Sequence, residues 1–426
     1  MHPAATDLRV DGQRLWRSLM DLAALGATPR GGVCRLALTE LDRQGRDRVV
    51  AWAREAGLAV TVDAIGNVFM RRAGRDATRP PVMMGSHIDT QPTGGKFDGC
   101  YGVLAGLEVL RTLNDHGVAT QAPIELAFWT NEEGSRFVPV MMGSGVFAGA
   151  FTLQHAWSAT DLEGHRVHDE LRRIGYLGEE VPGEHPLAAY FEAHIEQGPV
   201  LEAHDKTIGV VTGVLGIRWF DCTVTGQEAH AGPTPMVVRR DALQVAAGLM
   251  QEVVAIAGRH GPDGRGTVGQ VQVHPNSRNV IPGRVRFSVD LRNASDAAVD
   301  AMAADLHARV AEAAARSGLT VVLEPASAYP AQAFDADCIA AVAAAAGRLG
   351  YPSMPVVSGA GHDAVYLARR APTGMIFVPC KDGISHNEIE DARPEHLEAG
   401  CNVLLQVVLQ HAGEGVDAPA DAVRPA

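Results

Sequence analysis

A histidine and an aspartate stand two positions apart directly after a short apolar run of the chain. The run is 81–85, and His87 and Asp89 follow it. A short apolar run bounded by proline and glycine predicts a strand, and open α/β sheets bind ligands beyond the carboxyl ends of their strands. His87 could therefore ligate a metal while Asp89 holds its other ring nitrogen. The alternative is a capped turn with a hydrogen-bonded histidine, because both residue types are common in loops.

Three further carboxylates occupy comparable positions. Asp98 lies among glycines immediately before a predicted helix at 101–116. It could bridge two cations or cap the helix N-terminus. Glu132 and Glu133 follow a second apolar run, 123–130. Because adjacent residues point in different directions there, Glu133 could bind a metal while Glu132 acts as a general base; a solvated acidic turn is the alternative.

Two more histidines complete a set of metal-ligand types. His194 lies in an extended run that ends at Gly-Pro, and His386 follows the apolar run 375–379. Taken singly, each is more readily a core or surface histidine. Together, imidazoles and carboxylates without thiolates match zinc or manganese, and one shared carboxylate with two further ligands per ion makes a two-metal hydrolytic site. The predicted ligands are His87, Asp98, Glu133, His194 and His386.

The elements that must position these residues alternate between strand and helix. Apolar periodicity predicts helices near both ends of the chain, and short Val- and Ile-rich runs predict strands between them. This alternation is typical of an α/β fold in which a large mixed sheet has helices on both faces. The predicted helices are 15–22, 37–55, 101–116, 337–349 and 393–411, and the predicted strands are 58–70, 81–85, 123–130 and 375–379.

The middle of the chain follows a different pattern. Between 214 and 327 the predicted elements follow the order βαββαβ, which is that of a smaller α+β sheet with helices on one face. Apolar and polar residues alternate strictly over 284–292, so one sheet face stays polar and open, which suits a lid or a dimer contact. We therefore expect a catalytic domain at 1–213 and 328–426, with a flexible tail from about 413, and an inserted lid or dimerisation domain at 214–327.

Composition excludes several classes of protein. The chain has 426 residues and a net charge of -13, which repels nucleic acid and anionic membrane surfaces. Its six cysteines contain no CxxC pair, so we expect reduced thiols and a cytoplasmic protein. Charged residues near the start and the lack of a run of about 18 uncharged apolar residues predict neither a signal peptide nor a membrane span.

Six motifs follow one another in order along nearly the whole chain: 85–90 (GSHIDT), 94–99 (GGKFDG), 130–137 (TNEEGSRF), 192–199 (EAHIEQGP), 227–235 (QEAHAGPTP) and 384–388 (ISHNE). Together they resemble the hydantoinase/carbamoylase family. This family comprises amidohydrolases related to dizinc aminoacylases and carboxypeptidases, and it includes N-carbamoyl-L-amino acid hydrolases, β-ureidopropionases and allantoate amidohydrolases. In the wider clan a carboxylate often stands at the position of His194, so the histidine resembles the ureido-cleaving branch.

The resemblance implies how the ligands divide between two divalent metal ions. One metal is held by His87, Asp98 and His194, and the other by Asp98, Glu133 and His386. Glu132 is the implied general base, which takes a proton from a water that bridges the metals and returns it to the leaving nitrogen.

Further roles are also implied by the resemblance. His230 stabilises the oxyanion, delivered from the small domain and from the partner subunit, while Asn279 and Arg292 anchor the substrate carboxylate. Gln197 contacts the ureido group. A turn histidine and a solvated arginine are the ordinary alternatives. The loop 359–363 resembles a pocket loop of the family, although a Gly-rich turn before a helix explains it equally well.

The predicted function is hydrolysis of N-carbamoyl-L-amino acids, which are small ureido acids, to amino acid, carbon dioxide and ammonia by a homodimer. Allantoate amidohydrolase, which forms ureidoglycolate, is the nearest alternative. The segment 90–98 looks more like the carbamoylase and β-ureidopropionase branch. A catalytically inactive binding protein is a third possibility, and the presence of Glu132 with all five candidate ligands argues against it.

Overall fold

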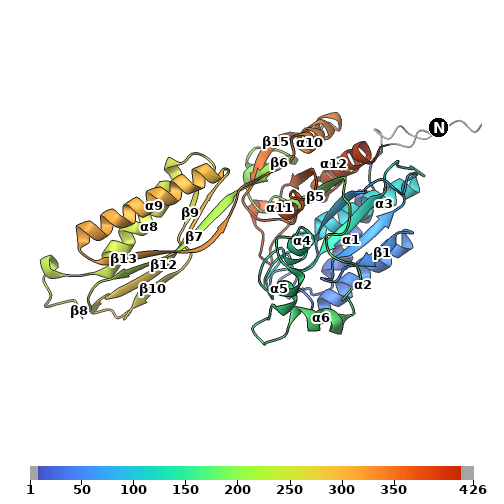
Figure 1. The fold of residues 1–426 in the computed structure, drawn as a ribbon. Helices are drawn as coiled ribbons and strands as arrows, with labels where there is room; N and C mark the ends of the chain where they lie inside the picture. The colour runs from blue at the N-terminus through green and yellow to red at the C-terminus, as the bar shows by residue number, and fades with distance from the viewer. Residues whose placement is uncertain (1–7, 414–426) are drawn as a thin grey trace, which may run out of the picture. The chain divides into compact units, whose positions relative to one another are not determined.

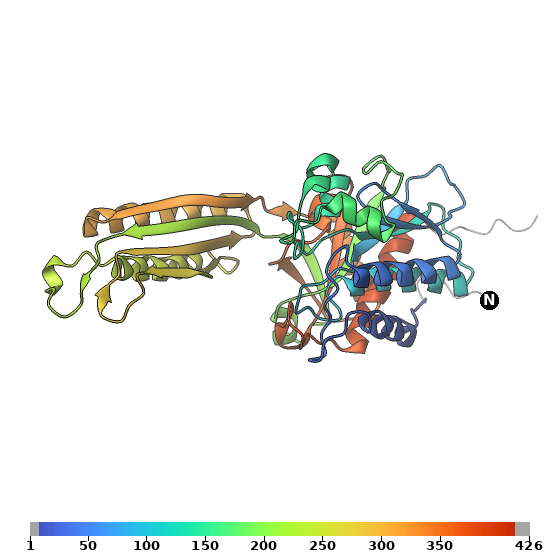
Figure 2. The same cartoon turned by 90° about the horizontal axis from the view of Figure 1, so that it is seen from below.

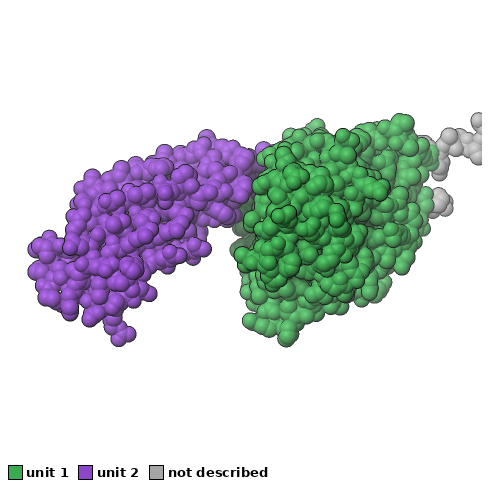
Figure 3. All heavy atoms as spheres, turned by 60° about the horizontal axis from the view of Figure 1, so that its bottom comes forward, with its two compact units in different colours: residues 1–212, 334–426 green, residues 213–333 purple. Residues whose placement is uncertain are grey.

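The structure is a computed structural model in which residues 8–413 are described. It divides into two compact units, coloured in Figure 3: unit 2 is Gly213–Ala333, and unit 1 is the remainder of the chain. Unit 2 continues beyond the predicted boundary at 327 because strand β13 (Thr320–Tyr329) is longer than expected and is followed by β14 (Gln332–Ala333). The predicted tail beyond Gly413 lies outside the described residues.

Unit 1 contains a mixed sheet with the strand order β1-β2-β4-β3-β5-β16-β6, and β15 pairs with β6. Strands β3, β4, β5 and β16 are mutually parallel, whereas β1, β2 and β6 pair antiparallel with their neighbours. The parallel strands are buried along their whole length, as expected when both sheet faces are covered. The strand bounds are β1 (Ala59–Val62), β2 (Val68–Arg72), β3 (Val82–His87), β4 (Ile124–Trp129), β5 (Ala189–Ile195), β6 (Ile208–Val214), β15 (Ser353–Ser358) and β16 (Thr373–Val378).

Helices cover both faces of this sheet (Figures 1 and 2). Val378 of β16 lies beside Gly400 of one helix, while the ring of the preceding residue, Phe377, contacts His362 near another. Neighbouring strand residues point to opposite faces, so α12 and α11 lie on opposite sides. The helices are α1 (Gly12–Ala23), α2 (Glu40–Glu55), α3 (Cys100–Asp115), α4 (Met142–Phe147), α5 (Leu153–Ser158), α6 (Val167–Ile174), α7 (Val200–Ala203), α10 (Ala336–Arg348), α11 (Ala364–Leu367), η3 (Lys381–Gly383) and α12 (Pro394–Ala412).

Unit 2 is a five-stranded antiparallel sheet with the path β10-β12-β7-β13, and β9 pairs with β12. Helices α8 and α9 pack on it and on each other. On β12, Val285, Phe287, Val289 and Leu291 are buried, while the alternating polar residues are exposed or half-buried. The elements are β7 (Gly216–Thr225), β8 (Ala229–His230), η2 (Met236–Val238), α8 (Ala242–Arg259), β9 (Arg265–Thr267), β10 (Val271–His274), β11 (Val280–Ile281), β12 (Arg284–Asn293) and α9 (Asp296–Ser317), together with β13 and β14.

The predicted fold class, α/β with an inserted α+β sheet, is confirmed. Helices α4 to α6 and strands β6 and β15 were not predicted, because each is too short for its apolar period to distinguish a helix from a strand. Within residues 8–413, none of the helices combines the length and the apolar character that crossing a bilayer requires.

Candidate metal centre

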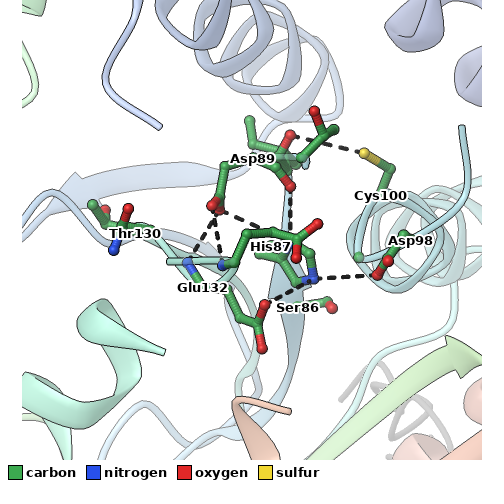
Figure 4. A network of polar contacts seen from close by, with 12 residues as sticks. Ser86, His87, Asp89, Asp98, Cys100, Thr130 and Glu132 are labelled. Carbon is green, nitrogen blue, oxygen red and sulfur yellow. Dashed lines mark hydrogen bonds and ion pairs between the residues drawn. The ribbon is translucent and has the colours of Figure 1, made fainter. Parts of the chain in front are cut away.

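The predicted ligands of unit 1 gather at the carboxyl ends of the parallel strands. His87 is the last residue of β3, Glu132 and Glu133 follow β4, and His194 is the penultimate residue of β5. Asp98 lies in the loop before α3 and faces His87 in Figure 4. Because parallel strands end at one edge of a sheet, segments distant in sequence meet there.

The first ligand group is His87, Asp98 and His194, whose candidate ligand atoms all lie within 4.8 Å of one another. Asp98 Oδ1 is 3.7 Å from His87 Nε2 and 3.3 Å from His194 Nε2. Main-chain carbonyls hold the rings from behind: His87 Nδ1 is 3.0 Å from the Asp89 carbonyl oxygen, and His194 Nδ1 is 2.9 Å from that of Ile195. Both Nε2 atoms are therefore directed toward the same carboxylate oxygen.

The second ligand group is Asp98, Glu133 and His386, again within 4.8 Å of one another. His386 Nε2 is 3.2 Å from Asp98 Oδ2 and 3.4 Å from Glu133 Oε2. The His386 side chain is 50% exposed, whereas His87 and His194 are almost fully buried. Asp98 thus presents one oxygen to each group, which is the geometry of a bridging ligand.

The alternative that Asp98 caps α3 does not hold. The N-cap residue of α3 is Gly99, and no side chain caps this helix. Gly99 has φ +64°, and a Cβ added there would lie 2.4 Å from the His87 ring. Glycine at this position lets the backbone turn beneath the imidazole, so that Asp98 can face both groups.

Asp89 holds the other ring nitrogen of His87, as expected, but through its carbonyl oxygen and not through its carboxylate. Its carboxylate Oδ1 is 3.8 Å from His87 Nδ1, too far for a hydrogen bond. Instead its two oxygens accept the backbone N–H groups of Glu132 and Glu133, each at 3.2 Å (Figure 4). Asp89 therefore holds the turn that carries both glutamates. The Glu132 carboxylate approaches within 3.5 Å of His87 Nε2.

Burial and mutual repulsion dominate the electrostatics of the site. Burial lowers the pKa of His87 to about 4, which leaves the ring neutral as a metal ligand requires. Burial and the carboxylates of Asp363 and Glu133 raise the pKa of Glu132 well above its usual range. Burial also raises the pKa of Asp98, but the hydrogen bonds to His194 and His386 outweigh it and hold this pKa well below normal.

This donor set fits divalent metal ions. Imidazole nitrogens and carboxylate oxygens, without thiolates, form both ligand groups. Several carboxylates packed at one buried edge are costly unless cations neutralise them. The described residues can therefore hold two ions that share Asp98, and the same donors suit zinc or manganese.

Three side chains hold the second group in place. Gln91 Nε2 donates to Glu133 Oε2 at 2.7 Å, and the Ser135 hydroxyl donates to Gln91 Oε1 at 2.7 Å. Gln197 Nε2 donates to Asp98 Oδ2 at 2.9 Å. Gln197, predicted to contact the ureido group, thus lies against the bridging carboxylate in this structure. Gln91 stands in the segment 90–98 and Ser135 in the motif 130–137, but nothing local in the sequence indicated their partners.

The loop 359–363 lies against the first group. Its residue His362 is buried, with its ring centroid 4.6 Å from that of His194 and its Nε2 2.9 Å from Ser358 Oγ. The next residue, Asp363, is also buried and accepts the hydroxyl of Ser144. Helix α11 begins at Ala364, as expected from a Gly-rich turn. The sequence did not show that this turn packs against a ligand.

The remaining predicted site residues belong to unit 2. His230 lies on β8, is exposed, and accepts the Gly232 N–H at Nδ1 (3.1 Å). Asn279 lies beside it, because its carbonyl accepts the N–H of Ala231 at 2.9 Å and β8 pairs with β11. Arg292 is on β12 and forms an ion pair of 2.8 Å with Asp290. Unit 2 therefore brings His230 and Asn279 together.

Comparison with protein families gives a match over residues 83–410 to a model described as peptidase family M20/M25/M40. The chain belongs to this family. It is 48% identical over 404 residues to an N-carbamoyl-L-amino-acid amidohydrolase of Rhizobium meliloti, covering 95% of this chain and 97% of the relative. It is 39% identical over 405 residues to an N-carbamoyl-L-amino acid amidohydrolase of Geobacillus stearothermophilus, covering 94% and 98%.

A solved structure supports the same placement within M20/M25/M40. The crystal structure of an amidase of the hydantoinase/carbamoylase family from Burkholderia multivorans is 61% identical, with a TM-score of 0.94 over 96% of this chain and 100% of that one. The resemblance to the hydantoinase/carbamoylase family and the prediction of an amidohydrolase are therefore confirmed.

Proposed function

We propose that this M20-family chain hydrolyses N-carbamoyl-L-amino acids to the amino acid, carbon dioxide and ammonia, using two divalent metal ions. The observation that carries the proposal is Asp98, whose two oxygens face two separate ligand groups beside the Glu132 carboxylate. The names of the relatives support the ureido substrate class.

Bound zinc or manganese ions would supply Lewis acidity, which polarises the ureido carbonyl and lowers the pKa of water. Glu132 acts as general base, since its carboxylate faces the ligand groups and its backbone is held by Asp89. It takes a proton from the attacking water and delivers it to the leaving nitrogen. The raised pKa of Glu132, caused by burial and nearby carboxylates, favours the proton acceptance that this role needs.

Unit 2 supplies the substrate contacts in this proposal. Arg292 binds the substrate carboxylate, either in place of Asp290 or together with it. Asn279 also binds this carboxylate. His230, exposed beside Asn279, donates to the developing oxyanion. Gln197 can turn from Asp98 toward the ureido group. Its side-chain amide both donates and accepts hydrogen bonds, which matches the N–H groups and the carbonyl oxygen of a ureido group.

We also propose a homodimer in which unit 2 carries the contact. Large apolar side chains are exposed on this unit: Trp219, Met236, Val237 and Val238. Met236, Val237 and Val238 are consecutive, and a contiguous exposed apolar segment is typical of an interaction surface. Sedimentation equilibrium should give twice the chain mass, and a monomeric mass would overturn this proposal. A cytoplasmic location is part of the proposal, supported by six cysteines that are all free.

Ammonia release tests the function. The purified protein, reloaded with Mn²⁺ or Zn²⁺, is offered N-carbamoyl-L-amino acids, N-carbamoyl-β-alanine and allantoate, with N-acetyl amino acids and dipeptides as controls. Hydrolysis of the controls yields no ammonia, so it is followed by the release of free amino acid. We expect turnover of the N-carbamoyl-L-amino acids. Turnover of allantoate alone would reassign the substrate within the same chemistry, and activity on the controls alone would refute ureido hydrolysis.

A further inference from the structure

Glu390 is a buried carboxylate that the proposed mechanism does not use. Its side chain is 2% exposed. Oε1 accepts the backbone N–H groups of Phe97 at 2.9 Å and of Asp98 at 3.1 Å. Oε2 lies 2.7 Å from the hydroxyl of Ser385, the residue before His386. The Glu390 carboxylate therefore joins the loop of Asp98, the bridging ligand, to the loop of His386, which belongs only to the second group.

The surrounding chain is shaped around this carboxylate. A Cβ added at Gly95 would lie 2.0 Å from the carboxyl group of Glu390, so the glycine leaves the space that the carboxylate fills. The Ser385 hydroxyl also lies 3.0 Å from Asp98 Oδ2, the oxygen that faces His386. The chain of contacts thus runs from Glu390 through Ser385 to the metal-binding oxygen itself.

The position of His386 depends on such contacts more than the other imidazoles do. His87 and His194 are strand residues whose rings are held by main-chain carbonyls. His386 follows the short helix η3, has φ +53° and is half exposed. A loop in a left-handed conformation needs external bonds to keep one geometry. Glu390, four residues after His386, makes two such external bonds, to the N–H groups of Phe97 and Asp98, and a third bond to Ser385 within its own loop.

We propose that Glu390 is a positioning residue for the second metal. It holds the loop of His386 at the distance from Asp98 at which both side chains can bind the same ion. This inference rests on the proposed two-metal function. It distinguishes Glu390 from a residue needed only for folding, because its loss should affect the two ligand groups unequally. Partners that orient metal ligands typically contribute about 10- to 100-fold to metal affinity.

Asp63 offers a matched control. It is a buried carboxylate whose Oδ1 accepts two backbone N–H groups, from Ile65 at 3.1 Å and Asn67 at 2.9 Å, and whose Oδ2 accepts the Asn67 side chain at 2.9 Å. Its hydrogen bonding reproduces that of Glu390, but it lies in the turn between β1 and β2 and belongs to neither ligand group. Asp63→Ala therefore measures how metal binding responds when a buried, hydrogen-bonded carboxylate is lost away from the metal ligands.

The experiment titrates the metal-free full-length protein with Co²⁺, followed by visible absorption, with equilibrium dialysis for stoichiometry. We expect two binding steps in the unsubstituted protein. Glu390→Ala should weaken the second step about 10- to 100-fold and leave the first within about threefold. Glu390→Gln should restore most of the affinity, because its amide can accept both N–H groups and still donate to Ser385. Asp63→Ala should not change the ratio of the two dissociation constants.

Several results would overturn the inference. An unchanged second step in Glu390→Ala, or an equal weakening of both steps as in a general loss of structure, would each do so. If Glu390→Ala does not fold, Ser385→Ala removes the link to Glu390 Oε2 and the contact with Asp98 Oδ2 but leaves both backbone bonds of Glu390. It should still weaken the second step selectively, and no selectivity there counts against the inference.

The titration also separates failure of this inference from failure of the proposed function. A single Co²⁺ in the unsubstituted protein would refute the two-metal function and Glu390's role together. Two bound ions without ammonia release from any ureido acid would refute only the proposed substrate, and the Glu390 comparison would still decide the inference.

Discussion

The two ligand groups share Asp98 but are built in different ways. In the first, His87 and His194 are strand residues, nearly fully buried and oriented by main-chain carbonyls. In the second, His386 comes from a half-exposed loop, and side chains such as Gln91 hold the ligands. Sheet topology thus positions the first group, whereas individual hydrogen bonds position the second. We expect tighter metal binding in the first group, because less of its geometry must be ordered when the ion binds.

The largest expected effect comes from the proposed general base, which lies beside both groups. Glu132→Gln should lower kcat by about 10²- to 10⁴-fold, since the amide cannot accept the proton. Metal stoichiometry should be unchanged, because Glu132 is in neither ligand group. Ammonia release and dialysis measure the two quantities, with exposed Glu163→Gln as the control. Near-normal turnover would remove Glu132 as the base.

The histidines of the two groups should contribute differently to the free energy of unfolding of the metal-free protein. Burial lowers the pKa of His194, but the hydrogen bond to Asp98 outweighs it and raises the pKa to about 9, so the two form a buried ion pair without metal. Removing one partner of such a pair costs about 3–5 kcal/mol, so His194→Ala should lower the free energy of unfolding by that order.

His386→Ala is the paired measurement. Because the His386 side chain is half exposed, its pair with Asp98 is screened by solvent, and the loss should stay below about 1 kcal/mol. Urea denaturation of both metal-free variants tests the difference. Equal losses would mean that the loop is held as firmly as the strands.

Among the effects on metal binding, the smallest should come from the loss of the hydrogen bond behind Glu133. Gln91→Ala removes the donor at 2.7 Å and should weaken the second Co²⁺ step about tenfold, with the first step unchanged. Ser135→Ala, which removes only the bond that orients Gln91, should have a smaller effect in the same direction. A larger change in the first step than in the second would contradict the division into two groups.

Much of the site could be predicted because its ligands follow apolar strands. His87, Glu133 and His194 stand at the ends of strands, and these strands could be predicted from short apolar runs bounded by proline or glycine. Glu390 could not be found in this way, because its partner Phe97 lies 293 positions away. The loop 359–363, which contains His362, resembled a pocket loop of the family, but its neighbour could not be named, since only the packing of the loop against β5 brings His362 to His194.

Residue types and local spacing were enough to specify the donor atoms, the strands that carry most of them and the inserted second sheet. The reason is that the apolar periods of strands and helices depend only on residues close together in the sequence. The folded chain alone settled how those atoms are used. Asp98 turns one oxygen to each group, and Gln197 lies on the bridging carboxylate. Asp89 contacts the His87 ring through its carbonyl oxygen, while its carboxylate accepts two backbone amides. Hydrogen-bond partners are chosen by distance in space, and for buried groups that distance is set by the packing of segments far apart in the chain.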